Sequence, residues 1–282
     1  MSPANGGVDA ALVTRLEGIA ASARQDILRA ITNAGAGHTG GSLSVTDILT
    51  ALYFRVLRND PERPDWPERD RLVLSKGHAS AGFYAVLAAR GYFSREEFVE
   101  NYDTVDSIFM GHPDRLKTPG VETSTGSLGH GLSVAIGMAL GLKAKGPAAH
   151  VYAVLGDGEL DEGQVWEALM YAGTHKVSGL TAIVDFNKLQ LVGRVEETMA
   201  LEPLVPKLES FGWKVVECDG HDIAELITVL EAACEDPDAP VIVLAHTVKG
   251  KGVPFIEDQV AWHARVPTPE ELKQGLAELG VK

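Results

Sequence analysis

The stretch VYAVLGDGELDEGQVWEALMYAGTHKVSGLTAIVDFN, residues 151–187, decides the fold class of this chain. Residues 151–156 form an apolar run with β-branched side chains, and residues 180–187 repeat that character. The segment between them carries its apolar residues at helical spacing. A strand, a helix and a second strand in this order predict a βαβ crossover with parallel strands.

The same pattern returns later in the chain. WKVVECDG (213–220) reads as a strand, IAELITVLEAACED (223–236) as a helix and PVIVLAHT (240–247) as another strand. The alternation predicts an α/β fold in three αβα layers, with helices on both faces of a mostly parallel sheet. No linker or low-complexity segment divides the sequence, so we expect residues 1–282 to form a single domain.

Further helices are predicted from apolar residues at helical spacing. They cover 8–30 and 43–57, with a glycine-rich loop at 33–42 between them. A helix at 128–145 is apolar nearly all round, so we expect it to be buried in the core or against a second subunit. The irregular stretch 101–127 is long for a structureless loop, which makes it a candidate functional loop.

Composition excludes several classes of partner. The chain has 39 acidic against 25 basic residues and a formal charge of −14, which argues against binding nucleic acid or an anionic membrane. Two cysteines are too few for a disulfide framework and indicate a reducing compartment. The sequence shows neither a secretory signal nor an apolar run long enough for a membrane span, so we expect a cytoplasmic protein.

Oxygen-bearing side chains follow two of the predicted strands. Asp157 comes directly after residues 151–156, and Asn187 follows the next strand 30 residues later. Ligands of open α/β sheets bind at the carboxyl ends of the strands, so we expect both side chains in one crevice. A carboxylate and an amide oxygen suit Mg²⁺ when phosphates complete its coordination. Gly156 and Gly158 let the backbone approach a diphosphate closely.

Other acids crowd around Asp157. Glu159, Asp161 and Glu162 lie within five positions of it. Acidic residues in the first turn of a helix complement the helix dipole. We therefore interpret Glu159 and Asp161 as solvated charges at the start of the helix that follows.

Glycine-flanked histidines form a second set of candidates. Imidazole titrates near neutrality, and neighbouring glycines let the backbone crowd a ligand, a combination that suits proton transfer. The candidates are His38, His78, His112 and His130 in loops, and His263 after the basic, glycine-rich segment VKGKGVPF. We expect the others, His150, His175, His221 and His246, to be structural or solvent-exposed.

The run GDG, followed about thirty residues later by Asn, resembles the thiamine diphosphate signature. The longer run GDGELDEGQVWEA…LTAIVDFNKLQ resembles transketolases, and the resemblance extends from the first helix to AWHARVP. It implies a thiamine diphosphate-binding fold and a divalent cation, Mg²⁺ or else Ca²⁺ or Mn²⁺. By residue match the cation ligands are Asp157, Asn187 and the carbonyl oxygen of Leu189. The resemblance makes Gly158 a diphosphate contact, and in TGSLGHG it places the backbone of Gly126 and Leu128 against the aminopyrimidine.

The resemblance also implies catalytic roles. It carries His38, His78, His112 and His263 into a channel where histidines contact sugar hydroxyls and move protons as the C2–C3 bond of a ketose breaks, with His263 also near the diphosphate. Glu162 becomes a subunit-interface carboxylate in a proton network between two active sites, and Glu167 is a further candidate for that network. His130 stands where the family often has glutamine, and Ser127 where it often has proline, so neither is given a role in the chemistry.

Transketolases are usually much longer than this sequence. Nothing here corresponds to the family's pyrimidine-binding domain, which carries the activating glutamate, or to the arginines that grip the sugar phosphate. We therefore expect the N-terminal subunit of a split transketolase, a transferase of pentose phosphate metabolism. The expected partner is a C-terminal subunit in an α₂β₂ assembly, without which the chain is inactive. The expected reaction moves a two-carbon ketol unit from a ketose phosphate to an aldose phosphate.

Other classes share the GDG…N pattern. The α subunit of a 2-oxoacid dehydrogenase and the first domain of deoxyxylulose-phosphate synthase are alternatives within thiamine diphosphate enzymes. The segments SKGHAS, GHPD and HTVKGKGV favour transketolase, because they supply the histidines that contact sugars. A non-catalytic cofactor-binding module remains a third alternative, which would keep Asp157 and Asn187 but would not need the histidines.

Overall fold

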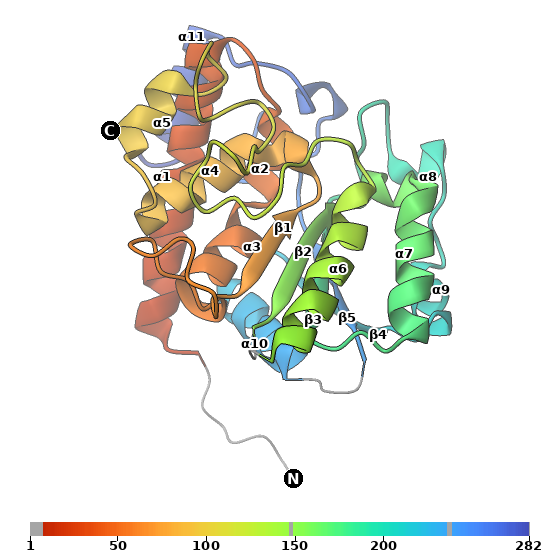
Figure 1. The fold of residues 1–282 in the computed structure, drawn as a ribbon. Helices are drawn as coiled ribbons and strands as arrows, with labels where there is room; N and C mark the ends of the chain where they lie inside the picture. The colour runs from red at the N-terminus through yellow and green to blue at the C-terminus, as the bar shows by residue number, and fades with distance from the viewer. Residues whose placement is uncertain (1–7, 147–148, 236–238, 282) are drawn as a thin grey trace.

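A parallel β-sheet lies at the centre of the computed structural model, which describes residues 8–146, 149–235 and 239–281 (Figure 1). Its five strands follow the order β1-β2-β3-β5-β4, and each neighbouring pair is parallel. The strands are β1 (Arg71–Leu74), β2 (Val151–Gly156), β3 (Leu180–Phe186), β4 (Lys214–Asp219) and β5 (Val241–His246). The predicted α/β class with a mostly parallel sheet is thus confirmed.

Helices cover both faces of the sheet. Alternate side chains of a strand point to opposite faces. Tyr152 and Val154 therefore belong to one apolar core, while Ala153 and Leu155 belong to the other. The first core is covered by α1 (Ala10–Ala34), α3 (Thr46–Ala51), α4 (Ser80–Arg90), α5 (Arg95–Asn101) and α10 (Ile223–Cys234). The second is covered by α6 (His130–Lys145), α7 (Gly163–Thr174) and α9 (Leu204–Ser210). Figure 1 shows α1 and α7 on opposite sides of the molecule.

The N-terminal helices differ from their predicted boundaries. Helix α1 begins after Asp9, whose carboxylate caps the N–H of Ala11, and ends at Gly35 with φ of 66°. The glycine-rich loop expected at 33–42 is wrong in its second half, because α2 (Thr39–Ser44) begins inside it. A Cβ on Gly40 would lie 2.9 Å from the Lys249 side chain and from a backbone oxygen, so glycine there permits close packing of a helix.

The expected single helix at 43–57 is divided. It consists of the end of α2, then α3, and then a π-helical turn at Leu52–Val56. The remaining short helices are α8 (Val195–Thr198) and α11 (Pro269–Glu278), with single 3₁₀ turns at Gly77–Ala79, Gly158–Asp161 and Val260–Trp262. None of the helices in the described ranges combines the length and the apolar character needed to cross a membrane.

Helix α6 is buried on one side only. Leu132, Ala135 and Ala139 belong to the second core, whereas Val134 and Leu140 are 38% and 39% exposed. The core of this chain therefore covers one side of the helix only, and burial of the other side against a second subunit stays a prediction. Residues 102–129, which precede α6, form turns without a helix or strand and contribute His112, Gly126 and Leu128 to the lining of the cavity described next.

Candidate active site

Two neighbouring strand ends meet at the floor of a cavity of about 280 Å³. Strands β2 and β3 pair in parallel with Gly156 opposite Asp185, so the residues that follow them emerge at the same edge of the sheet. Asp157 and Asn187 both line the cavity, together with Gly156, Gly158 and Leu189. The structure thus brings together the strand-end residues that the sequence singled out.

Asp157 is buried and receives backbone hydrogen bonds. Its side chain accepts from the N–H of Gly158 at 2.8 Å and from the N–H of Lys188. Burial, and next the negative charge of Asp185, raise the pKa of Asp157 to about 7. A bound divalent cation would act in the opposite direction and favour the ionised carboxylate. The raised pKa of Asp157 therefore fits a cation site.

The oxygen atoms near Asp157 also fit a hard cation. The Leu189 carbonyl oxygen accepts a hydrogen bond from the Lys249 ammonium at 3.1 Å, so a positive group already contacts this oxygen. The side-chain oxygen of Asn187 accepts from the N–H of Leu189 at 3.1 Å. Carboxylate, amide and carbonyl oxygens are ligands typical of Mg²⁺ and Ca²⁺. Among the described residues, no three His, Cys, Asp or Glu side chains form an alternative metal site.

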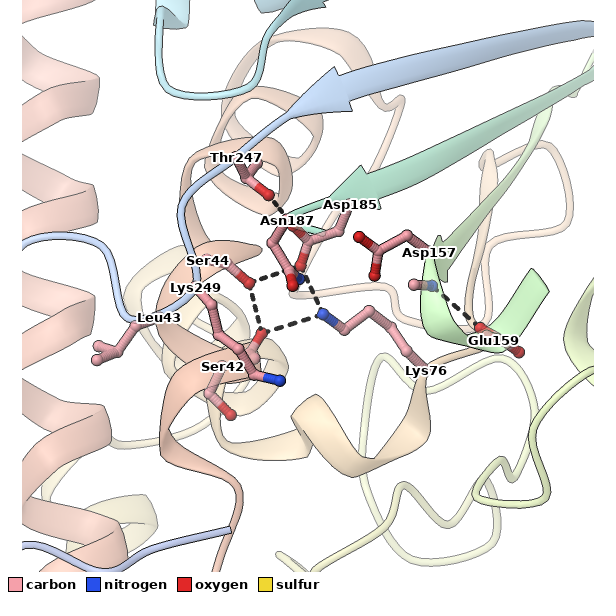
Figure 2. A network of polar contacts seen from close by, with 12 residues as sticks. Ser42, Leu43, Ser44, Lys76, Asp157, Glu159, Asp185, Asn187, Thr247 and Lys249 are labelled. Carbon is pink, nitrogen blue, oxygen red and sulfur yellow. Dashed lines mark hydrogen bonds and ion pairs between the residues drawn. The ribbon is translucent and has the colours of Figure 1, made fainter. Parts of the chain in front are cut away.

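Two buried lysines line the same cavity, and neither was among the site residues predicted from the sequence. Lys76 and Lys249 are each 2% exposed, which is rare for an ammonium group. Lys76 forms an ion pair with Asp185 at 2.5 Å, and Figure 2 shows its ammonium directed toward the Asp185 carboxylate. Burial, followed by the charge of Lys76, lowers the pKa of Lys249 to about 8. Positive charge inside this acidic chain is a feature that favours an anionic ligand.

Four of the predicted histidines form one cluster at the cavity. The ring of His38 lies 5.1 Å from that of His78, 5.4 Å from that of His263 and 6.3 Å from that of His112, measured between centroids. His78 and His263 are stacked at 5.3 Å. The four residues come from the start of α2, the loop after β1, the 102–129 loop and the turn at Val260–Trp262, so only the tertiary fold unites them.

Three of these imidazoles, those of His38, His78 and His263, have a lowered pKa that favours the neutral form. Burial, followed by Lys76, lowers the pKa of His78 well below its ordinary value, and burial followed by His112 lowers the pKa of His38. Burial and then Lys249 lower the pKa of His263 to about 3. The Lys249 ammonium lies 2.8 Å from Nδ1 of His263 and donates to it, which leaves Nε2 as the protonated nitrogen of that ring.

Glycines on two sides of the cavity permit close packing, Gly126 in the loop before α6 and Gly158 after β2. Gly126 has φ of 147°, and a Cβ there would lie 2.9 Å from the His112 ring. A Cβ on Gly158 would lie 2.8 Å from the Gln190 side chain. Gly126 and Leu128 line the cavity, so the loop that precedes α6 contributes backbone to the site as well as His112.

Glu159 corrects the interpretation of the acidic stretch. It is only 2% exposed and is no solvated helix charge. Its carboxylate accepts from the N–H of Gly129 at 2.9 Å, from the N–H of Gly156 at 3.1 Å and from the Ser75 hydroxyl. Asp161 is also less solvated than expected, because it accepts from the Gln190 amide at 3.2 Å. The two residues lie in a 3₁₀ turn, and α7 begins only at Gly163.

The outer carboxylates lie away from the cavity. Glu162 and Glu167 are exposed at the start and in the first turns of α7 and do not line the cavity. His130 is exposed at the first position of α6 and does not line the cavity either. The remaining histidines have structural contacts or solvent exposure, as in the bond between His221 Nδ1 and Asp47 at 2.7 Å.

Comparison with known proteins identifies the family to which this fold and site belong. The profile of the transketolase thiamine diphosphate binding domain matches residues 17–282. The chain belongs to the transketolase family. The transketolase crystal structure from Campylobacter jejuni superposes with a TM-score of 0.89 at 33% identity, over 96% of this chain and 43% of that one. This transketolase-family chain therefore spans under half of the solved enzyme.

Relatives of matching length exist among the transketolases. One subunit of the apulose-4-phosphate transketolase of Actinobacillus succinogenes is 46% identical over 90% of this chain and 91% of its own length. A 6-deoxy-6-sulfo-D-fructose transketolase subunit from a Clostridium strain is 44% identical over 91% and 93%. Human transketolase is 36% identical, and the match covers only 40% of its length. This transketolase-family chain thus matches transketolase subunits over nearly their whole length, in agreement with the split organisation expected from its sequence.

Proposed function

We propose that this chain is the cofactor-binding subunit of a two-subunit transketolase. In this proposal residues 1–282 act as one domain that binds thiamine diphosphate and Mg²⁺, with Ca²⁺ or Mn²⁺ as replacements. The assembled enzyme transfers a two-carbon ketol unit from a ketose phosphate to an aldose phosphate. The observation that carries the proposal is the shared cavity, which joins the strand-end pair Asp157 and Asn187 to a cluster of four histidines.

Different groups of the chain would bind different parts of the cofactor: oxygen atoms the cation, and backbone and lysine the diphosphate. Asp157, Asn187 and the Leu189 carbonyl would hold the cation, while Gly156 and Gly158 allow the backbone to contact the diphosphate. Lys249 supplies a buried positive charge beside them. When bound, thiamine diphosphate supplies the electron sink that C–C bond cleavage requires.

The histidine cluster would orient the sugar and exchange protons with its hydroxyl groups. His38, His78 and His263 are neutral, because the pKa of each is lowered. The rings of His38 and His78 each offer one N–H donor and one acceptor to hydroxyl groups, whereas Nδ1 of His263 already accepts from Lys249 and only its Nε2–H remains to donate. A positioned neutral imidazole can accept a proton from a hydroxyl group and later return it. We assign these three residues and His112 the tasks of orienting the sugar and moving protons at its hydroxyl groups.

The partner subunit has a suitable surface to occupy. On α6 and α7 the exposed side of the helices carries Val134, Leu140, Met170 and Tyr171, with exposed fractions from 38% to 51%. Monomeric proteins seldom leave such a face uncovered. We propose that this face is buried in an α₂β₂ assembly with a C-terminal subunit, and that Glu162, which precedes α7, then joins the proton network between active sites.

Reconstitution tests the function. The chain alone, supplied with thiamine diphosphate and Mg²⁺, should transfer no ketol unit from xylulose 5-phosphate, and addition of the C-terminal subunit should produce turnover. A panel of sugar donors and acceptors that includes apulose 4-phosphate and 6-deoxy-6-sulfo-D-fructose would define the substrate. Pyruvate with glyceraldehyde 3-phosphate tests the synthase alternative. Substantial turnover by the chain alone would refute the split organisation.

Cofactor and interface have separate tests. Asp157→Ala and Asn187→Ala should each weaken Mg²⁺-dependent binding of thiamine diphosphate in calorimetry, and unchanged affinity in both would refute the cation site. Leu140→Asp and Met170→Asp should reduce co-purification with the C-terminal subunit. Ala277→Asp, on α11 against the opposite core, is the matched control and should leave co-purification unchanged.

A further inference from the structure

Asp185 is a fully enclosed carboxylate directly beneath the cavity. Its side chain has no solvent exposure, and it does not line the cavity itself. It accepts from the Lys76 ammonium at 2.5 Å, from the Ser44 hydroxyl at 2.6 Å and from the Thr247 hydroxyl, as Figure 2 shows. Neither the cavity lining nor the histidine cluster accounts for a carboxylate at this position.

The donors to Asp185 come from three other segments of the chain. Lys76 follows β1, Ser44 ends α2 and Thr247 follows β5, while Asp185 itself lies near the end of β3. One carboxylate therefore joins four segments that are far apart in the sequence. Because the carboxyl ends of parallel strands meet at one edge, three of these four segments reach the cavity from strands of the same sheet.

A regular spacing relates this junction to the cavity. Residues that line the cavity stand two positions after three of the joined residues: His78 after Lys76, Asn187 after Asp185 and Lys249 after Thr247. These residues follow the strand ends, with His78 in the 3₁₀ turn Gly77–Ala79, and a separation of two residues keeps each cavity residue within a few ångströms of its joined neighbour along the chain. The junction thus holds each segment close to the point at which its cavity residue emerges.

We propose that Asp185 is a positioning residue that sets the relative places of His78, Asn187 and Lys249 through its bonds to Lys76, Ser44 and Thr247. The expected effect on ligand binding rests on the proposed function: if Asn187 and Lys249 are misplaced, binding of Mg²⁺ and thiamine diphosphate weakens. The junction itself is testable without any ligand. Partners behind metal ligands commonly contribute roughly 10- to 100-fold to metal affinity.

The test compares Asp185→Asn with Asp26→Asn in the full chain. Asp26 is a matched control, since it is 4% exposed, accepts from Arg95 at 2.7 Å and does not line the cavity. In amide hydrogen exchange, Asp185→Asn should lose protection together in peptides covering 38–46, 75–80 and 246–252, with the centre of the sheet still protected. The control should change only peptides of α1 and α5. Uniform loss of protection throughout the chain, or no loss in the three peptides, overturns the proposal.

Calorimetry with thiamine diphosphate and Mg²⁺ gives the second measurement. Asp185→Asn should bind roughly 10- to 100-fold more weakly than the unchanged chain, while Asp26→Asn should not differ. If the unchanged chain fails to bind even in complex with the C-terminal subunit, the proposed function fails, and hydrogen exchange still decides the role of Asp185. If Asp185→Asn does not fold, Thr247→Val removes one bond without a change in shape and should expose only 246–252. Native exchange there would contradict the proposal.

Discussion

Replacement of Glu159 by alanine should destabilise the chain strongly although the residue lies in an acidic stretch that looks solvated. The substitution removes the acceptor of three donors, the N–H groups of Gly129 and Gly156 and the Ser75 hydroxyl. A buried donor without a partner costs about 1–3 kcal/mol. The total for three donors is partly offset, because the variant no longer buries a charged carboxylate and because water can enter the space that it leaves. We expect the free energy of unfolding to fall by about 3 kcal/mol, out of the roughly 5–15 kcal/mol typical of a folded domain.

Urea unfolding followed by tryptophan fluorescence measures this change. The matched control is Glu162→Ala, because Glu162 is exposed, lies three residues further on and makes no capping bond with its side chain. A substitution at such a surface position should change the unfolding free energy by less than about 0.5 kcal/mol. If the two variants unfold at the same urea concentration, the carboxylate of Glu159 does not hold β1, β2 and the start of α6 together as we describe.

Three other predictions concern pH, packing and charge. The pKa of His263 is lowered to about 3, below the ordinary 6.5, so its contribution to stability is complete above pH 6.5 and is lost as pH falls towards 3. Between pH 6.5 and 4 the unfolding free energy of His263→Gln should therefore fall less steeply than that of the unchanged chain, with a difference in slope of less than about 1.4 kcal/mol per pH unit. Parallel curves for the two proteins would contradict this prediction. Gly173→Ala would place a Cβ 1.8 Å from the Phe211 carbonyl oxygen and should cost at least about 1–3 kcal/mol in urea unfolding, whereas Gly163→Ala has nothing within 4 Å and should be nearly neutral. Lys249→Met should weaken calorimetric binding of thiamine diphosphate by roughly tenfold or more, with the exposed Lys273→Met as control, and equal affinities would show that this charge does not act on the diphosphate.

The central part of the fold could be predicted from the sequence because buried parallel strands read as apolar runs. The segments at 151–156 and 180–187 indicated both the strands and the residues that follow them, and parallel pairing is sufficient to bring Asp157 and Asn187 to one edge. Short surface helices were harder, since their apolar faces are small. For α11 a signal did exist, because TPEE at 268–271 forms a capping box with Pro269 at the start.

The charged residues of the site could not be predicted in the same way. Glu159 is buried because Ser75 and Gly129, distant in sequence, supply its donors, and no local pattern contains that information. The dipole argument for acids at a helix start is sound in general but wrong for this residue. Lys76 and Lys249 stand beside His78 and in a glycine-rich segment, where their charge resembles ordinary surface charge until the fold encloses them.

The two enclosed lysines have a consequence for how anions reach this chain. With a formal charge of −14, the exterior repels a negatively charged molecule at long range, while attraction operates only within a few ångströms of Lys76 and Lys249. Dissolved salt screens the distant repulsion over a Debye length of about 8 Å at physiological ionic strength but hardly reaches buried charges. Association of anions with the chain by itself should consequently become faster as ionic strength rises, the reverse of what is seen when a protein guides its ligand electrostatically from afar.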